Sequence, residues 1–142
     1  MDILLGRRFP MEDRLERVLT LIRNHSHSTL DLARLADTAS LSRFHFLRLF
    51  HRTFRQTPHQ LIIRTRIERA KTLLTETAKS VTEICLEVGF DSLGTFSTQF
   101  HRRVGYSPSV FRQKTRDQRN HPRNYIPECY VQQFHLDSFL PK

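Results

Sequence analysis

Residues 42–58 read SRFHFLRLFHRTFRQTP and residues 92–108 read SLGTFSTQFHRRVGYSP, so one pattern occurs twice at a period of fifty residues. In each copy a serine precedes apolar residues with helical spacing, and a Ser/Thr-Pro pair begins the next element. Because self-similarity at a fixed period indicates a repeated structural unit, the chain is predicted to contain two tandem helix-turn-helix units. The matched positions are Ser42 with Ser92, Phe46 with Phe96, Phe50-His51-Arg52 with Phe100-His101-Arg102, and Thr57-Pro58 with Ser107-Pro108.

Helical periodicity also precedes the first copy of the repeat. Apolar residues at positions i, i+3, i+4 and i+7 predict a helix that begins after Pro10. The tetrapeptide Ser28-Thr29-Leu30-Asp31 resembles a capping box and predicts the start of a short second helix. The buried positions expected in these two helices are Leu15, Val18, Leu19, Ile22, Leu32, Leu35 and Ala36.

A long helix is predicted between the two copies. Pro58 stands at a first-turn position, and the helical pattern extends to about Thr75. At 1.5 Å per residue, this helix is a rod of about 25 Å. The apolar stripe expected along it consists of Leu61, Ile62, Ile67, Ala70, Leu73 and Leu74.

The second half of the chain repeats the helical signals. Ser80-Val81-Thr82-Glu83 forms a capping box before a short helix that Gly89 ends, and Pro108 begins a last helix through Phe111. Polar and apolar residues alternate convincingly only at residues 131–136. The predicted fold class is therefore all-α, with two tandem helix-turn-helix subdomains joined by a long linker helix.

These elements divide the chain into five expected segments. The segments are an N-terminal extension at residues 1–10, a first helix-turn-helix subdomain at 11–57, the linker helix at 58–76, a second helix-turn-helix subdomain at 77–115 and a C-terminal tail at 116–142.

The composition describes a small basic protein. The chain has 142 residues and a formal net charge of +9. No apolar run approaches the roughly 18 residues of a membrane-spanning helix, and the N-terminus does not have the pattern of a signal peptide. Cys85 lies within an apolar helical pattern, so Cys85 and Cys129 are expected to be reduced thiols. We therefore expect a cytoplasmic protein.

The positive charge is concentrated in two blocks. Residues 40–71 carry eight Lys or Arg side chains against Glu68 alone, and residues 102–123 carry seven against Asp117 alone. Solvated helix faces in an arginine-rich chain would produce a similar pattern. Alternatively, the blocks form two contact patches for a polyanion such as nucleic acid.

The longer helix of the first copy has two apolar faces. Phe46, Leu49 and Phe50 share one face, whereas Phe44 and Leu47 lie on another with arginines around them. Either Phe44 and Leu47 pack against a neighbouring helix, or they are exposed. If exposed, they suit a DNA major groove, where arginine binds guanine or phosphate and apolar atoms meet thymine methyls.

Four stretches of this chain resemble the AraC/XylS family of bacterial transcription regulators. Residues 42–50 (SRFHFLRLF) look like the family's first recognition helix, and residues 58–74 (PHQLIIRTRIERAKTLL) resemble its linker helix. Residues 84–90 (ICLEVGF) and 96–112 (FSTQFHRRVGYSPSVFR) resemble its second half. The resemblance implies that one chain reads two adjacent major-groove segments of double-stranded promoter DNA, and that it does so as a monomer.

The resemblance also implies roles for individual residues. In the second unit, Leu93 and Gly94 offer no side-chain hydrogen bond, and Thr98 stands where the family often has arginine. Sequence readout is therefore expected mainly from the first unit. The implied DNA-binding residues are Ser42, Arg43, Phe44, Leu47, Arg48 and Arg52 in the first unit, and Leu93, Thr95, Thr98, Gln99, Arg102 and Arg103 in the second.

Other classes of function find little support in the sequence. It has no Gly-rich phosphate loop, no G-x-S-x-G elbow and no His-x-x-x-His or Cys-x-x-Cys pair, so we predict neither an enzyme nor a cofactor or metal site. The segments outside the resemblance are too short for a small-molecule effector domain, which suggests the stand-alone MarA/SoxS branch of the family or a fragment. The alternative function is that of an interaction protein, acting mainly through RNA polymerase or another regulator.

Overall fold

The computed structural model describes residues 10–120, and this part of the chain consists of seven helices joined by short turns and loops, with no strand. The all-α prediction is therefore confirmed, while the alternating residues 131–136 lie outside the described range. The helices are α1 (Pro10–His25), α2 (Leu32–Thr38), α3 (Arg43–Phe54), α4 (Pro58–Glu76), α5 (Val81–Glu87), α6 (Leu93–Val104) and α7 (Pro108–Asn120).

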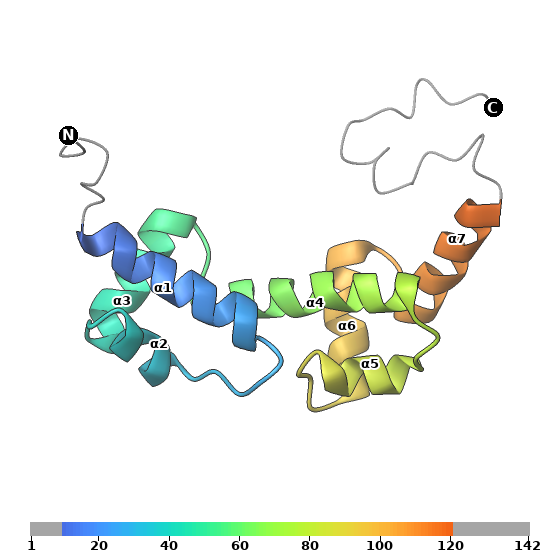
Figure 1. The fold of residues 1–142 in the computed structure, drawn as a ribbon, viewed down its shortest axis with the longest axis horizontal. Helices are drawn as coiled ribbons and strands as arrows, with labels where there is room; N and C mark the ends of the chain where they lie inside the picture. The colour runs from blue at the N-terminus through green and yellow to red at the C-terminus, as the bar shows by residue number, and fades with distance from the viewer. Residues whose placement is uncertain (1–9, 121–142) are drawn as a thin grey trace, which may run out of the picture.

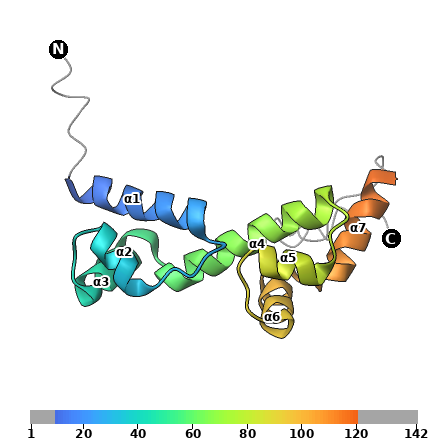
Figure 2. The same cartoon turned by 60° about the horizontal axis from the view of Figure 1, so that its bottom comes forward.

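Helix α4 connects two groups of three helices. Helices α1 to α3 gather around its first half and α5 to α7 around its second half, so the molecule is elongated along α4 (Figure 1). The view in Figure 2 shows the same division from another side. No helix within residues 10–120 is long and apolar enough to cross a membrane.

Two separate hydrophobic cores correspond to the two groups, and α4 contributes to both. Ile62 belongs to the first core, whereas its neighbour Ile63 belongs to the second. Ile63 is absent from the apolar stripe predicted from the sequence, because a single stripe assumes that one helix faces one core. The phenylalanines of the repeat, which are fully buried, are Phe46 and Phe50 in the first core and Phe96 and Phe100 in the second.

Polar side chains cap the N-termini of several helices. Ser42 accepts a hydrogen bond from the His45 amide at the start of α3, and Ser92 accepts one from the Thr95 amide at the start of α6. Reciprocal capping boxes begin α4 and α5, as predicted for α5. These local bonds satisfy amides that the helices themselves leave unpaired.

The predicted capping box at Ser28 is wrong. The Ser28 hydroxyl donates to the His25 carbonyl at 2.8 Å and so serves the end of α1. Asp31 begins α2 instead, because its carboxylate accepts a hydrogen bond from the Arg34 amide at 2.6 Å. Both residue types favour N-caps, and the path of the chain out of α1 decides between them.

Helix α7 is longer than the sequence pattern predicted. It extends to Asn120 rather than to Phe111. No Gly or Pro occurs between Pro108 and residue 121, so nothing in the chain interrupts the helix. Phe111 packs edge-on against Phe100 with ring centroids 5.5 Å apart, which attaches the start of α7 to the second core.

Candidate nucleic-acid interface

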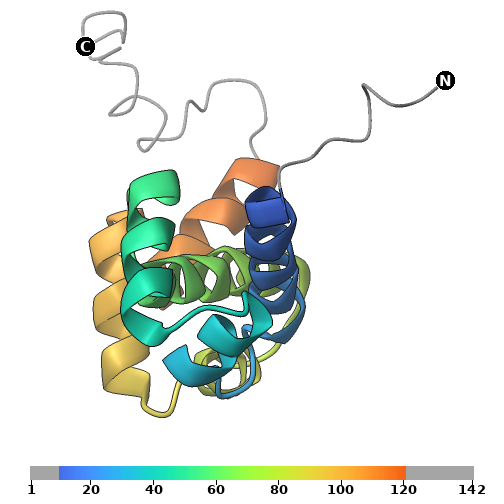
Figure 3. The same cartoon turned by 90° about the vertical axis from the view of Figure 1, so that its left-hand side faces the viewer.

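Helices α3 and α6, the second helices of the helix-turn-helix pairs α2–α3 and α5–α6, lie on the same side of the molecule. Viewed along α4, they project on the same side and run in the same direction, whereas α1 lies on the opposite side (Figure 3); along α4 they are separated, α3 beside its first half and α6 beside its second half (Figure 1). Both helices have twelve residues and the same arrangement of buried phenylalanines. The repeat in the sequence therefore produces two equivalent helices that face one common surface.

The outer face of α3 combines an exposed aromatic ring with arginines. The Phe44 side chain is 81% exposed, so it does not pack against a neighbouring helix. Leu47 is half-buried and lines a cavity of about 200 Å³ together with Leu32 and Pro58. Of the two alternatives predicted for this pair, exposure therefore applies to Phe44, whereas Leu47 lies against residues of α2 and α4. The arginines exposed on α3 are Arg43, Arg48 and Arg52.

The first turn of α3 presents backbone amides. Ser42 is exposed, and its side chain and carbonyl bind the amides of His45 and Phe46. The amides of Arg43 and Phe44 precede these bonds and are available to an acceptor. An anion such as a phosphate is favoured at this end of a helix by both the amides and the helix dipole.

The outer face of α6 is smaller and less charged in its first two turns. Leu93 is 44% exposed, Thr95 and Thr98 are exposed, and Gln99 is half-buried. A side chain added at Gly94 would meet nothing within 4 Å, so this position leaves open space at the start of the helix. Because Gly94 has no side chain, a binding partner can approach the backbone closely at the start of α6.

The hydroxyl of Thr95 is already engaged on one side. The hydroxyls of Ser92 and Thr95 are hydrogen-bonded to each other, with their oxygens 2.9 Å apart. Ser92 itself was missing from the predicted site residues. Its match with Ser42 in the fifty-residue repeat is the signal that would have identified it.

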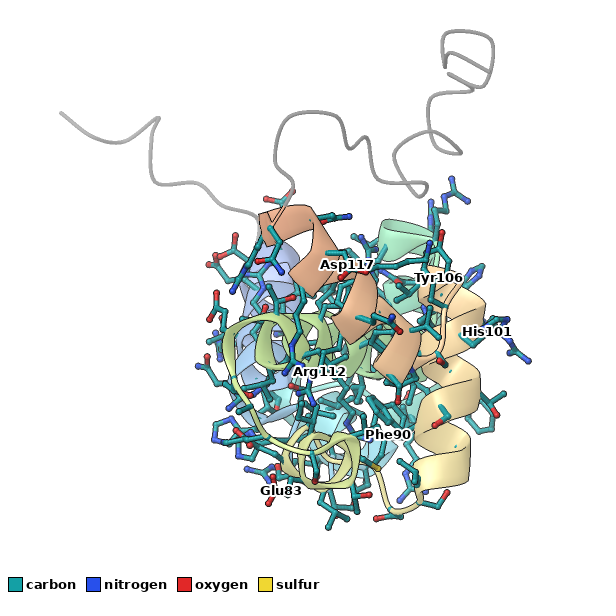
Figure 4. All side chains as sticks on the ribbon, turned by 90° about the vertical axis from the view of Figure 1, so that its right-hand side faces the viewer. Glu83, Phe90, His101, Tyr106, Arg112 and Asp117 are labelled. Carbon is teal, nitrogen blue, oxygen red and sulfur yellow. The ribbon has the colours of Figure 1, made fainter. Side chains whose placement is uncertain are left out.

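The last turn of α6 carries Arg102 and Arg103, both exposed, next to His101. His101 projects from α6 away from the rest of the molecule (Figure 4). Within residues 10–120, none of the five exposed arginines of α3 and α6 forms an ion pair with a carboxylate. Their charge is therefore available to a polyanion.

Cys85 lies in the core of the second unit and is 1% exposed. Burial raises the pKa of the Cys85 thiol, and the nearby charge of Asp91 raises it further, so the neutral thiol is favoured. This position agrees with the apolar helical pattern around Cys85 in the sequence, from which a reduced thiol was expected. Cys129 lies outside the described residues, and residues 10–120 contain no cluster of potential metal ligands.

Comparisons with known proteins identify the family. A family model described as a helix-turn-helix domain matches residues 35–114. The MmsAB operon regulatory protein of Pseudomonas aeruginosa is 36% identical over 102 residues, which cover 72% of this chain and 33% of that protein. The HTH-type transcriptional activator RhaS of Shigella boydii is 36% identical over 104 residues, covering 70% of this chain and 36% of that protein.

Solved structures show the same relationship. The DNA-binding domain of AdpA, determined in complex with a target DNA, is 30% identical with a TM-score of 0.70, covering 78% of this chain and 98% of that chain. An AraC-type regulator from Chromobacterium violaceum is 26% identical with a TM-score of 0.68, covering 73% of this chain and 93% of that chain. These relatives are regulators, in agreement with the prediction that the chain is not an enzyme. The chain belongs to the AraC/XylS family of helix-turn-helix transcription regulators.

Proposed function

We propose that this chain binds double-stranded promoter DNA by placing α3 and α6 in two successive major-groove segments on one face of the duplex. The observation that supports this most directly is that both helices lie on the same side of α4 with unpaired arginines exposed (Figure 3). The groove faces the same side of the duplex about every 34 Å, which is compatible with the nineteen-residue α4 as a spacer. The AdpA domain, which resembles this chain, binds a target DNA.

In the first unit, we assign base reading to Arg48 and contacts with thymine methyls to Phe44 and Leu47. Arg43, Arg52 and the first-turn amides that follow Ser42 would hold the phosphate backbone. Each of these residues except Leu47 is exposed on α3.

In the second unit, we assign base contacts to Thr95, Thr98 and Gln99 and an apolar contact to Leu93. Arg102 and Arg103 would bind phosphate. Thr95 and Thr98 are exposed. This division places more of the readout on α3 than on α6.

Transcription activation is the regulatory outcome that the relatives favour. This chain spans 33% and 36% of the lengths of the MmsAB regulator and RhaS, and RhaS is named an activator. We propose that the two subdomains, residues 11–57 and 77–115, bind DNA as one monomer associated with the nucleoid and bring RNA polymerase to the promoter. A protein that acts only through other proteins would not need two matched helices with unpaired arginines.

Footprinting on genomic fragments tests this proposal. The chain should protect two adjacent major-groove segments on one face of the duplex. Fluorescence anisotropy with the protected sequence and a scrambled duplex of equal length then measures specificity, for which specific sites commonly exceed random DNA by about 10³-fold or more. Equal affinity for the two duplexes would contradict sequence-specific binding and favour the interaction alternative.

A further inference from the structure

The two units meet at a junction beside α4, where a loop from each unit approaches the other. From the first unit comes the segment Ser26–Ser28 between α1 and α2, and from the second comes the turn containing Gly89 and Phe90 between α5 and α6. Arg66 of α4 lies between these two segments.

Arg66 binds the loop of the first unit through two backbone carbonyls. Its Nε donates to the Ser26 carbonyl, and its Nη2 donates to the Ser28 carbonyl at 3.1 Å. Ser26 is 2% exposed, so this contact is shielded from water. A guanidinium is suited to this arrangement because its planar fork holds several donors in fixed directions, which a lysine ammonium does not.

The same guanidinium also contacts the second unit. The Arg66 carbon between the guanidinium nitrogens lies 5.7 Å from the centre of the Phe90 ring, within the range of a cation–π contact. Phe90 is 4% exposed and its ring centroid lies 5.2 Å from that of Phe96, which belongs to α6. Phe90 lies inside the second unit beside α6 (Figure 4). A continuous set of contacts therefore runs from the first unit through Arg66 to α6.

Gly89 allows the two backbones to meet. A Cβ atom at Gly89 would lie 2.8 Å from the His27 carbonyl oxygen, closer than side chains tolerate. The φ angle of Gly89 is +103°, a conformation that residues with a side chain rarely adopt. Burial lowers the pKa of Arg66 while the charge of Asp91 raises it, so the group is partly withdrawn from water with an acidic residue of the second unit nearby.

From these contacts we infer that Arg66 is a positioning residue, which holds α3 and α6 in one relative orientation and thereby sets the spacing of the two DNA half-sites that the protein accepts. This inference rests on the proposed function, because it concerns how the two helices engage one duplex. Two linked binding modules gain affinity only when their geometry lets both engage at once, and a rigid junction restricts that geometry.

The first experiment measures spacing preference with Arg66→Gln. Affinity is determined for the footprinted site and for the same site with one base pair inserted between the half-sites. The wild-type chain should prefer the original spacing, and in Arg66→Gln the ratio of the two affinities should fall about tenfold because the units adjust independently. Arg64→Gln is the matched control, since Arg64 is exposed on the same helix and loses the same charge. Its ratio should equal that of the wild type.

A conservative variant separates positioning from charge and folding. Arg66→Lys keeps the positive charge but not the planar fork, so its spacing ratio should also fall while random-DNA affinity stays near the wild-type value. If Arg66→Gln does not fold, Arg66→Lys decides the question. An unchanged ratio in a folded Arg66 variant would overturn the inference.

A second experiment needs no DNA and therefore distinguishes failure of this inference from failure of the proposed function. Spin labels are attached at His51→Cys and His101→Cys, which are exposed matched positions on α3 and α6, in a Cys129→Ser background. The distance distribution between the labels should broaden in Arg66→Gln and stay narrow in Arg64→Gln. If the distance distributions of the Arg66→Gln and Arg64→Gln variants have equal widths, Arg66 is not a positioning residue, even if the protein binds DNA. Broadening in Arg66→Gln alone would support its positioning role even if no specific DNA site exists.

Discussion

At the scale of single residues, Arg48 and Arg52 provide a direct comparison between base reading and phosphate binding. Both are exposed on α3. We predict that Arg48→Ala weakens specific binding by about 1–3 kcal/mol and relaxes the preference at one base pair, as expected for an arginine bound to a guanine edge. Arg52→Ala should weaken specific and random duplexes alike. Titrations with a panel of single-base variants measure both effects, and equal losses for Arg48→Ala on specific and random DNA would exclude base reading.

The buried thiol of Cys85 should lower the stability of the folded chain at alkaline pH. Because burial raises the pKa of its thiol in the folded state, the unfolded chain ionises more readily once the pH exceeds the ordinary thiol range. The free energy of unfolding should therefore be unaffected by this group near neutral pH and should fall as the pH rises above that range. Urea denaturation at about pH 7 and about pH 10 measures the loss. The Cys85→Ala variant is the control and should lose less stability over the same interval.

At the scale of helices, α3 and α6 have the same backbone arrangement but different surfaces. Because α3 presents Arg48 and the exposed ring of Phe44, base-pair substitutions under α3 should cost about 1–3 kcal/mol each. Under α6, where Gly94 leaves open space and Leu93 lacks a polar group, most substitutions should cost less than about 0.5 kcal/mol. Scanning every base pair of the footprinted site checks this asymmetry. Similar penalties in both half-sites would indicate that Thr95, Thr98 or Gln99 reads bases strongly.

At the scale of the whole molecule, the two basic blocks of the chain predict that DNA binding depends strongly on salt concentration. If each of the two basic blocks, residues 40–71 and 102–123, neutralises about three phosphates, the logarithm of the binding constant should fall against that of the salt concentration with a slope near −5. Anisotropy titrations over a series of salt concentrations measure this slope. A double variant, Arg102→Gln with Arg103→Gln, should make the slope shallower by about 2, because each lost phosphate contact contributes about one unit. A wild-type slope shallower than about −2 would contradict a two-patch interface.

Local interactions explain why much of the fold was predictable from the sequence. The starts of α3, α4 and α6 depend on Ser42, Pro58 and Ser92, whose effects act within one helical turn. The buried phenylalanines follow from helical spacing, and the repeat of fifty residues shows that two units exist. Each signal lies within a short stretch of chain and needs no knowledge of what packs against it.

The candidate site was predictable in composition but not in exposure. The stripe of Phe44 and Leu47 was identifiable from periodicity, yet one residue is 81% exposed and the other lines a cavity beside α4. Periodicity reports which residues share a helix face, but the position of neighbouring helices decides how much of that face is covered. The contributions of adjacent Ile62 and Ile63 to different cores were hidden for the same reason.

The amino-acid sequence by itself determined the helices, most of their caps, the two units and the basic residues of α3 and α6, because these depend on neighbours in the chain. Only the tertiary structure decided that Asp31 rather than Ser28 begins α2 and that α3 and α6 face one side (Figure 3). It also decided that Arg66 joins the two units, since its partner carbonyl at Ser26 lies 40 residues away. Contacts between residues so distant in the chain arise only after the helices pack, when burial and chain path bring their atoms together.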